Sequence, residues 1–510
     1  MWKELKKMSR WKRKEQTSTC VWNKEKKEVE GKEAMKEWKD TFEELGKENL
    51  EDTKFDTTFA KKIITKLQTQ IHHSQELKIM DDDTLDQEIT EDETTQSIQM
   101  LKIGKSAGID NIIPEMLTRG GEEIERYIGK LCQKIWTTEQ IPEEWRKGII
   151  CPIFKEGDEK DTSNYRGITL TSTVAKVFTQ ILFQRIMTWA EKNHTIEEEQ
   201  SGFRFFRGCQ DNLFTLIEII NNRGKEGTFC AFLDVRKAFD RVFRAGLWYE
   251  IYKQGIQGKM WRVLRKLYDK VESCVRIDGE TSEWFSLETG VKQGCILSPL
   301  LYALFINGLI KKLKKSKMGI RINTHNTLEV LFYADDIVLM TENKEKLQHM
   351  MNIIHKYAHK WRFEINPSKS GIIVFKKRDP PRNLKITLGE CEIKTTNVYK
   401  YLGIELTRTL RWKPYTQRIL EKAKRNMYKT WSMGVSKGFL NIKISVLIYQ
   451  ALVRSILEYG CEIWGEGCFL DFERLQRNMG RKILRCGLRT NEEVIRGELG
   501  WETLRARETK

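Results

Sequence analysis

The stretch VLFYADDIVLM, residues 330–340, decides the fold. Its two apolar arms flank the polar quartet Tyr-Ala-Asp-Asp, a pattern that predicts two β-strands joined by a tight hairpin turn. Such a turn presents Asp335 and Asp336 side by side, and like charges at close range repel each other unless a cation neutralises them. By itself the quartet is more often a plain polar turn, because Asp is favoured at turn positions. A third carboxylate close by in the fold is needed to favour a metal site.

The segment TFCAFLDVRKAFDRV, residues 228–242, offers that carboxylate. An apolar strand ends at Asp234, and a turn or the start of a helix follows. Carboxylates on neighbouring strand ends form the oxygen-rich kind of site that binds Mg²⁺. Two such ions, about 3.5–4 Å apart, activate a hydroxyl nucleophile and stabilise a leaving pyrophosphate. Asp234, Asp335 and Asp336 are therefore the candidate metal ligands.

The composition indicates a basic, globular protein. Its 510 residues suggest about three or four structural units, and its net charge of +17 favours a polyanionic partner, nucleic acid first. On charge alone, a basic protein without such a partner stays equally open. Eleven cysteines without a C-x-x-C pair predict neither a disulfide framework nor a zinc knuckle, and favour a reducing intracellular compartment, nucleus or cytoplasm. No apolar run approaches the ~20 residues of a membrane span, so no membrane partner is expected.

Changes in composition and hydrophobic pattern divide the chain into four parts. Residues 1–80 are predicted to form a helical N-terminal extension, since apolar residues recur at loosely helical spacing. Residues 81–96 hold eight acids and no base, which predicts a solvated, mobile linker. Residues 97–410 alternate short β-branched runs with amphipathic helices, which predicts an α+β fold. Residues 411–510 are predicted to be helical, with Lys and Arg along the first helix.

The individual strands and helices of the main body follow from hydrophobic periodicity. The predicted strands are 148–154, 228–235, 274–277, 330–333, 337–340 and 371–375. The predicted helices are 122–137, 172–192, 212–222, 299–315, 344–362 and 415–433.

Eight segments in a fixed order resemble the reverse transcriptases of non-LTR (LINE-type, jockey-like) retrotransposons. FLDVRKAFDRV (232–242) resembles motif A of that family, GVKQGCILSPLLYALFIN (290–307) motif B, FYADD (332–336) motif C, FEINPSKSGIIVF (363–375) motif D and YKYLGIEL (399–406) motif E. Upstream, KSAGIDNIIPEML (105–117), residues 141–170 and QSGFRFFRGCQDNLF (200–214) resemble its fingers elements. One such motif is weak, but eight in order leave little room for chance.

The resemblance implies a right-hand polymerase, with fingers and an antiparallel palm sheet over 97–410 and a helical thumb over 411–510. It implies an RNA-directed DNA polymerase that extends a primer with deoxynucleoside triphosphates on an RNA template during retrotransposition. The implied partners are an RNA template and a DNA primer, and the oligomeric state stays open. The thumb is expected to be truncated, and the region before residue 97 is expected to be too short for an endonuclease domain.

The resemblance also implies roles for the acidic site. Asp234, Asp335 and Asp336 are expected to bind two Mg²⁺ ions, with Mn²⁺ as an alternative, and the backbone carbonyl of Val235 is an expected further ligand. Lys369 matches the motif D lysine that protonates pyrophosphate, a general-acid step worth about 10²–10⁴-fold in rate. Without the motif, Lys369 is an ordinary loop lysine.

A second group of residues is expected to bind the incoming nucleotide. Lys155 and Arg166 resemble the fingers residues that grip the triphosphate, since a point charge and a planar donor fork both suit phosphate oxygens. Phe239 stands where the family has an aromatic steric gate against the ribose 2′-hydroxyl, although outside the motif it reads as a core residue. Gln293 and Gly294 form a loop expected beside the nucleotide, where glycine permits close approach of backbone.

A third group is expected to contact the template and the primer. Arg204 and Arg207 are expected to touch the template backbone with salt-sensitive, sequence-independent affinity. Tyr401, Leu402 and Gly403 resemble the primer-grip hairpin of the family.

Three positions depart from the family pattern: Ile296 replaces a usual Pro, and Phe206 and Arg362 each replace a common Gly. Two rival functions stay open. One is an RNA-directed RNA polymerase or a telomerase-like polymerase; the aromatic Phe239 and the Tyr-Ala-Asp-Asp quartet disfavour the RNA-making class. The other is a catalytically weak RNA-binding scaffold or maturase, which has no reason to keep a repulsive cluster of carboxylates.

Overall fold

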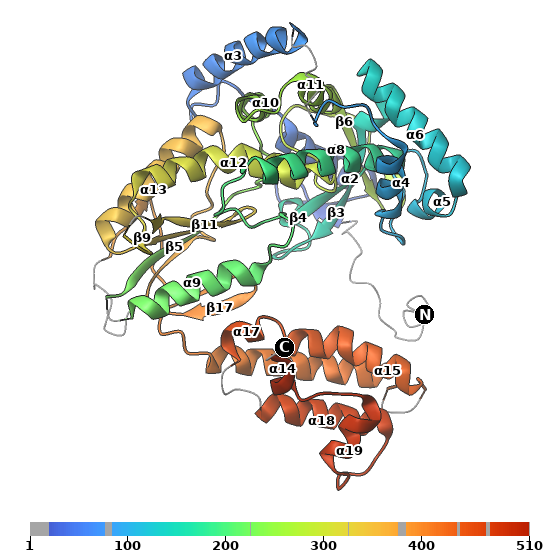
Figure 1. Cartoon of the computed structure of the whole chain (residues 1–510), viewed down its shortest axis with the longest axis vertical. Coiled ribbons are helices and arrows are strands. Elements are labelled where there is room, and N and C mark those ends of the chain that lie inside the picture. Colours follow the sequence, from blue (N-terminus) through green and yellow to red (C-terminus); the bar gives the residue numbers. More distant parts are fainter. Residues whose placement is uncertain are drawn as a thin grey trace.

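The computed structural model describes residues 20–76, 84–224, 226–324, 326–375, 384–435, 439–465 and 470–508. Its helices and sheets confirm the α+β class that the sequence predicts. In Figure 1 a large body holds the main sheets, and a smaller helical unit formed by the C-terminal part of the chain lies below it.

The central sheet of the body is the expected antiparallel palm sheet. Its strand order is β11 (Val330–Tyr333), β12 (Asp336–Thr341), β5 (Thr228–Asp234) and β13 (Gly371–Phe375), with every neighbouring pair antiparallel. Side chains alternate along β5, so Phe229, Ala231 and Leu233 belong to one hydrophobic core while Cys230 and Phe232 belong to another. Burial on both faces explains why these strands read as continuous apolar runs.

Helices cover both faces of this sheet. On one side lie α12 (Leu297–Ser316) and α13 (Lys344–Trp361), backed by α10 (Arg244–Lys253), and on the other lies α9 (Cys209–Arg223), as Figure 1 shows. The short strands β9 (Ile320–Arg321), β10 (Thr327–Leu328), β14 (Thr387–Leu388), β15 (Cys391–Glu392), β16 (Val398–Tyr401) and β17 (Ile404–Thr407) form three small hairpins beside the main sheet.

The fingers are built on a second, mixed sheet. Its order is β4 (Tyr165–Leu170), β3 (Lys147–Phe154), β6 (Val271–Ile277) and β7 (Glu280–Thr281), and β8 (Phe285–Leu287) also pairs with β6. The fingers helices are α4 (Glu91–Gln99), α5 (Pro114–Thr118), α6 (Gly121–Thr138), α7 (Glu143–Arg146), η1 (Thr162–Asn164), α8 (Thr173–Lys192) and α11 (Gly258–Leu267).

The N-terminal region is part of the body rather than an appendage. A hairpin of β1 (Cys20–Trp22) and β2 (Glu28–Glu30) precedes the helices α2 (Gly31–Gly46) and α3 (Thr57–Glu76), so this region is not wholly helical as predicted. Trp38 and Phe42 of α2 pack on the fingers sheet, and α3 packs on α10, α11 and α13. Residues 1–19 and 77–80 of the predicted extension lie outside the described residues.

The prediction of a mobile acidic linker is wrong for residues 84–96. The helix α4 starts with a capping box, in which Thr90 and Glu93 satisfy each other's backbone N–H groups. Glu93 also forms an ion pair of 2.6 Å with Arg185 of α8, and Ile98 is fully buried. Asp86 accepts hydrogen bonds from the backbone N–H groups of Lys259 and Met260. Acids are favourable at a helix N-terminus, so here acidity marks a helix start. Residues 81–83 lie outside the described residues.

The C-terminal unit is helical over its described residues, as predicted. It contains α14 (Lys413–Ser432), α15 (Ile442–Tyr449), η2 (Gln450–Arg454), α16 (Ser455–Leu457), α17 (Cys461–Trp464), α18 (Leu470–Leu484), α19 (Glu492–Leu499) and α20 (Leu504–Glu508). Its apolar side chains continue the core that runs under the palm sheet and α9. None of the helices in the described parts of the chain has the length and apolar character that crossing a membrane requires.

Candidate active site

Strand register brings the three aspartates together. In the β5–β12 pair, Asp234 lies directly opposite Asp336, although 102 positions separate them in sequence. Opposed residues of an antiparallel pair have Cα atoms about 4.5–5.5 Å apart. The predicted hairpin is confirmed, since Tyr333 pairs with Asp336 and only Ala334 and Asp335 form the turn. The turn is tight because Ala334 adopts a left-handed φ of 57°.

A buried glutamine, which the sequence did not single out, fixes this turn. The Gln200 amide oxygen accepts hydrogen bonds from the backbone N–H groups of Ala334 (3.0 Å) and Gly202 (2.9 Å). Gln200 has no exposed surface. A Cβ atom at Gly202 would lie 2.2 Å from the Ala334 nitrogen, so only glycine fits there. The segment at 200–202 therefore holds the aspartate turn in place, and its position inside QSGFR was the available signal.

The electrostatics of the cluster favour a bound cation. Burial, followed by repulsion from Asp335 and Asp234, raises the pKa of Asp336 to about 7. Burial also raises the pKa of Asp335, and repulsion from Asp234 adds to this shift. A divalent ion would remove both penalties, because it stabilises the charged form of each carboxylate.

The donor set fits Mg²⁺ bound jointly with a substrate. Among the described residues, no three His, Cys, Asp or Glu side chains form a metal cage on their own. Mg²⁺ is commonly held by one or two carboxylates together with substrate phosphates and water. The motif D segment at 364–366 pairs with the chain on either side of Val235. The Arg236 N–H donates to the Glu364 carbonyl, and the Asn366 N–H donates to the Asp234 carbonyl. This pairing does not use the Val235 carbonyl, which suits its expected role as a ligand.

The predicted gate residue Phe239 lies beside the aspartates. Its ring stacks on Tyr302 of α12, with ring centroids 5.3 Å apart, and meets the ring of Phe203 edge-on at 6.4 Å. Burial raises the pKa of Tyr302 well above its usual value, and the charges of Asp335, Asp336 and Asp234 add to the shift. The aromatic stack therefore adjoins the carboxylate cluster.

The motif B loop is held by residues that the sequence did not single out. The Gln293 amide donates a 2.7 Å hydrogen bond to Asp240, whose pKa burial raises to about 6. A Cβ atom at Gly294 would lie 2.6 Å from the carbonyl oxygen of Thr169, and the φ of Gly294 is 121°. Glycine is thus required here by the approach of the loop to strand β4.

Two predicted cations stand at the base of one fingers loop. Lys155 follows β3 and Arg166 lies in β4, and the charges of both lower the pKa of Asp335 against the effect of burial. Lys237 of motif A, which the sequence did not single out, reaches the same loop and donates to the carbonyls of Ser163 (3.3 Å) and Tyr165 (3.5 Å). Basic groups from the fingers and the palm therefore meet beside the aspartates.

Comparison with known proteins agrees with this arrangement. Residues 154–406 match the family model described as "Reverse transcriptase (RNA-dependent DNA polymerase)". The chain carries a reverse transcriptase domain. This domain contains Asp234, Asp335 and Asp336, the predicted gate Phe239, and the motif B residues Gln293 and Gly294.

Curated relatives extend the similarity beyond the reverse transcriptase domain. The probable RNA-directed DNA polymerase from transposon X-element of Drosophila melanogaster is 27% identical over 383 residues, covering 73% of this chain and 41% of that protein. The RNA-directed DNA polymerase from mobile element jockey of Drosophila funebris is 25% identical over 409 residues, covering 78% and 44%. The chain therefore spans less than half the length of these relatives.

Among solved structures, apo telomerase from Candida Tropicalis aligns with a TM-score of 0.41 and 13% identity, covering 74% of this chain and 68% of that chain. Telomerase from Candida albicans in complex with a TWJ fragment of telomeric RNA aligns with a TM-score of 0.41 and 11% identity, covering 74% and 71%.

In the reverse transcriptase domain, Lys369 lies within reach of the fingers loop. Its ammonium pairs with Glu156 at 2.5 Å, and its backbone carbonyl accepts a 2.8 Å hydrogen bond from the Tyr399 hydroxyl. Both ionic groups are exposed to solvent, so the pair contributes little to stability. The ion pair matters for the position of Lys369, because it links motif D to the loop that begins at Lys155.

The expected template contact of Arg204 is wrong. Its guanidinium is buried and forms two hydrogen bonds of 2.7 Å with Glu191, and it also donates to the carbonyls of Glu197 and Gln200. A guanidinium whose donors are used inside the protein has none left for phosphate. Arg207 is more accessible, with its side chain about one third exposed and paired with Glu198.

The three residues that resemble the primer-grip hairpin also differ in how exposed they are. The Tyr401 ring is buried against Phe232 of the palm sheet, and its place in a primer-grip hairpin stays a prediction. Leu402 and Gly403 form the turn between β16 and β17, with φ values of 44° and 85°. The Tyr459 hydroxyl of the thumb donates a 2.7 Å hydrogen bond to the Leu402 carbonyl, which joins this turn to the thumb.

The departures from the family pattern lie at turns. Phe206 and Arg362, which stand where glycine is common, have left-handed φ values of 59° and 61°. Glycine adopts that conformation without strain, which accounts for the usual residue. Arg362 is held by a hydrogen bond to the Asn49 carbonyl and by the ring of Phe55, both in the N-terminal region. Ile296 occupies the N-cap position of α12 and makes no side-chain capping hydrogen bond.

Proposed function

We propose that this chain is an RNA-directed DNA polymerase that extends the 3′-hydroxyl of a DNA primer with deoxynucleotides on an RNA template, in retrotransposition. The observation that carries the proposal is the register that sets Asp234 against Asp336, with Asp335 on the adjoining turn. The family of the domain and the printed names of its relatives support the same reaction.

Asp234, Asp335 and Asp336 would hold two Mg²⁺ ions, or Mn²⁺ ions, with help from the Val235 carbonyl. When bound, such ions activate the primer hydroxyl and neutralise the charge of the leaving pyrophosphate. The protein holds the carboxylates at fixed positions through strand pairing and through Gln200, so little reorganisation is needed during the reaction.

The remaining residues bind and orient the nucleotide. Lys155 and Arg166 grip the triphosphate, and Lys369 gives a proton to the departing pyrophosphate. Phe239 fills the space that a ribose 2′-hydroxyl would occupy. Gln293, oriented by its hydrogen bond to Asp240, and the adjoining Gly294 shape the nucleotide pocket.

The contacts proposed for template and primer are those whose groups stay accessible. Arg207 would touch the template backbone, and the backbone turn at Leu402 and Gly403 would touch the primer. Exposed main-chain groups and a partly exposed guanidinium both suit phosphate oxygens.

Primer extension on an RNA template with Mg²⁺ tests the proposal. We expect the chain to incorporate deoxynucleotides, and we expect Asp335→Asn to reduce the rate by at least about 10³-fold, because a metal ligand loses its charge. Asp278→Asn is the matched control, since Asp278 lies on the exposed turn between β6 and β7, where its left-handed φ of 49° also suits Asn.

The two variants separate chemistry from folding. Folded wild-type protein that binds RNA but extends no primer would refute the polymerase and favour the RNA-binding scaffold. Equal activity of Asp335→Asn and the wild type would remove the aspartate turn from the mechanism.

A further inference from the structure

The loop at residues 155–164 connects β3 to β4, and we call it the fingertip loop. Several other segments contact this loop in ways that the proposed function does not explain. It begins at Lys155 and ends two positions before Arg166, the two residues proposed to grip the triphosphate. A hydrogen bond from the Lys155 N–H to the Asn164 carbonyl closes its base. An exposed loop of this kind loses considerable conformational freedom when it is ordered.

The hairpin at residues 20–30, which we call the N-terminal hairpin, contacts this loop through both side chains and backbone. The Trp22 indole N–H donates a 3.0 Å hydrogen bond to the Asp158 carboxylate, and the Trp22 backbone N–H donates a 2.9 Å bond to the Lys160 carbonyl. The Lys160 ammonium pairs with Glu28 at 2.7 Å and lies 5.0 Å from the centre of the Trp22 ring. Four contacts thus join segments more than 130 positions apart in sequence.

Helix α2 supports the same loop from beneath. The hydroxyls of Thr41 and Thr162 lie 2.7 Å apart, at hydrogen-bond distance. The fully buried ring of Trp38 meets the ring of Tyr165 edge-on, with centroids 4.7 Å apart. A Cβ atom at Gly167 would lie 2.6 Å from the ring of Phe42, so strand β4 runs directly against this helix.

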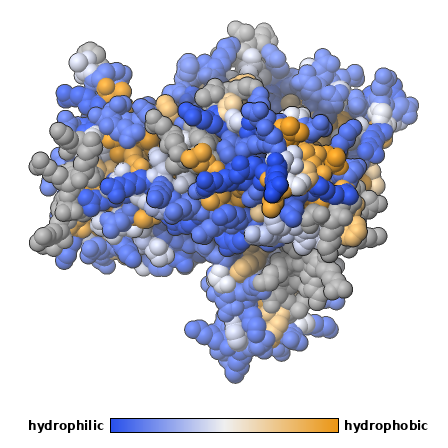
Figure 2. All heavy atoms as spheres, turned by 90° about the horizontal axis from the view of Figure 1, so that it is seen from below, coloured by the Kyte–Doolittle hydropathy of each residue, from blue (hydrophilic) through white to orange (hydrophobic). Residues whose placement is uncertain are grey.

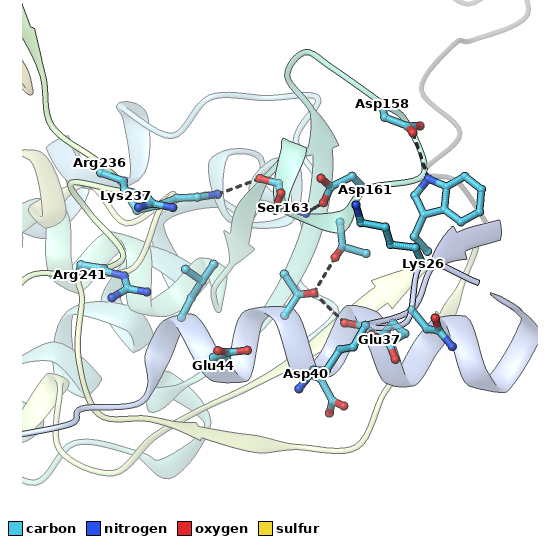
Figure 3. A pocket seen from close by; sticks show the side chains of 16 residues that line it. Lys26, Glu37, Asp40, Glu44, Asp158, Asp161, Ser163, Arg236, Lys237 and Arg241 are labelled. Atoms are coloured by element: carbon cyan, nitrogen blue, oxygen red, sulfur yellow. Dashed lines mark hydrogen bonds between the residues drawn. The ribbon is translucent and has the colours of Figure 1, made fainter. Parts of the chain in front are cut away.

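Motif A and motif D hold the opposite side of the loop. Lys237 bonds to the carbonyls of Ser163 and Tyr165, and Lys369 pairs with Glu156. Lys237 and side chains of the N-terminal hairpin, α2 and the fingertip loop line a cavity of about 850 Å³. In Figure 3, Lys237 reaches Ser163 on one side of this cavity, and the hydrogen bond to Asp158 lies on the other. The fingertip loop is therefore fixed between the N-terminal region and the palm.

We infer that the N-terminal hairpin and α2 are a positioning element that presets the fingertip loop for the triphosphate, with Trp22 and Asp158 as its key pair. The inference rests on the proposed function of Lys155 and Arg166. A loop ordered in advance spares the nucleotide the entropy of ordering it, so the contact strengthens nucleotide binding without touching substrate. Its loss should therefore change KM for deoxynucleotide rather than kcat.

The test compares Trp22→Phe, Asp158→Asn and the double variant in steady-state primer extension. Trp22→Phe removes the indole donor of this hydrogen bond, whereas Asp158→Asn keeps an acceptor but removes its charge. We therefore expect KM for deoxynucleotide to rise about three- to tenfold in Trp22→Phe and by less in Asp158→Asn, with kcat within about twofold of the wild type in both. The double variant should resemble Trp22→Phe, because without the indole donor the charge of Asp158 no longer acts through this bond. Hydrogen exchange of the amides at 155–164 should become faster in all three.

Matched controls lie elsewhere on the fingers. Trp284→Phe alters another partly exposed tryptophan with a lysine over its ring, and Asp278→Asn alters another exposed loop aspartate. Both controls should keep the wild-type KM and the wild-type exchange of the fingertip loop.

The outcomes separate this inference from the polymerase proposal. Wild-type protein that extends no primer counts against the polymerase proposal alone, and the exchange measurement still decides the inference. Unchanged exchange at 155–164 in Trp22→Phe and Asp158→Asn overturns the inference whatever the activity. An unchanged KM, or an equal fall of kcat and kcat/KM, also overturns it, since neither reflects a preset loop.

Discussion

At the scale of single residues, the ring of Phe239, the proposed gate, is held by two other rings. Tyr302 stacks on it and Phe203 meets it edge-on. We predict that Phe239→Ala raises the efficiency of ribonucleotide use relative to deoxynucleotide use by about 10- to 100-fold, because the steric exclusion is lost. Competing kcat/KM values measure this ratio. Phe214→Ala, which removes an exposed ring of α9 and keeps both contacts of Phe239, should leave it unchanged. Unaltered selectivity in Phe239→Ala would remove this residue from its proposed role as gate.

Residue types and their spacing predicted that the three aspartates lie together, which the strand register confirms, but they did not predict the partners of the arginines. Asp335 and Asp336 could be predicted from the local sequence pattern of a hairpin turn. Asp234 could be predicted from its place at the end of an apolar strand. Arg204 and Arg207 look alike in sequence, yet one is buried on Glu191 and the other is accessible. That difference depends on which carboxylates the fold brings near, and no local pattern encodes it. The same holds for Gln200 and Asp240, whose partners lie far away in sequence.

At the scale of elements, the aspartate turn depends on the segment at Gln200. We predict that Gln200→Met lowers the free energy of unfolding by about 1–3 kcal/mol, because it removes the acceptor of the Ala334 and Gly202 backbone N–H groups. It should also lower kcat, since the turn that carries Asp335 loses its brace. Denaturant unfolding and primer extension measure the two effects.

The matched control for Gln200 is Gln476→Met in the thumb. Gln476 is also buried, and it bonds to the Tyr449 hydroxyl and the Glu502 carbonyl. The control should lose similar stability and keep the wild-type kcat of folded protein. A kcat for Gln200→Met equal to that of the control would mean that the turn holds its shape without Gln200.

Whole strands and helices were predicted more accurately than their surroundings. The predicted strands 330–333 and 371–375 match β11 and β13, because burial on both faces makes such runs continuously apolar. The prediction of a mobile linker was wrong for residues 84–96, because charge composition does not reveal a helix cap or a buried Asp86. The role of the N-terminal hairpin also escaped prediction, because its contacts with the fingertip loop join distant segments.

At the scale of the whole molecule, the net charge of +17 suits the proposed partner, a primer–template duplex. Figure 2 shows a mainly hydrophilic face with apolar side chains in scattered patches. Along α14, Lys422, Arg425 and Lys429 recur at helical spacing on the exposed side, while Tyr415 and Ile419 face the thumb core. Phosphate binding by such a stripe releases counterions, so affinity falls as salt rises.

We predict that replacing Lys422, Arg425 and Lys429 together by Gln weakens primer–template binding and reduces the slope of log K against log salt by about two to three units, roughly 0.9 for each lost phosphate contact. Titrations of the RNA–DNA duplex at several salt concentrations measure the slope. The matched control replaces Lys61, Lys62 and Lys66 of α3, at the end of the molecule away from the thumb in Figure 1. Equal slopes for the two triple variants would show that the salt dependence reflects net charge alone. A smaller slope in the α14 variant only would place the duplex against the thumb.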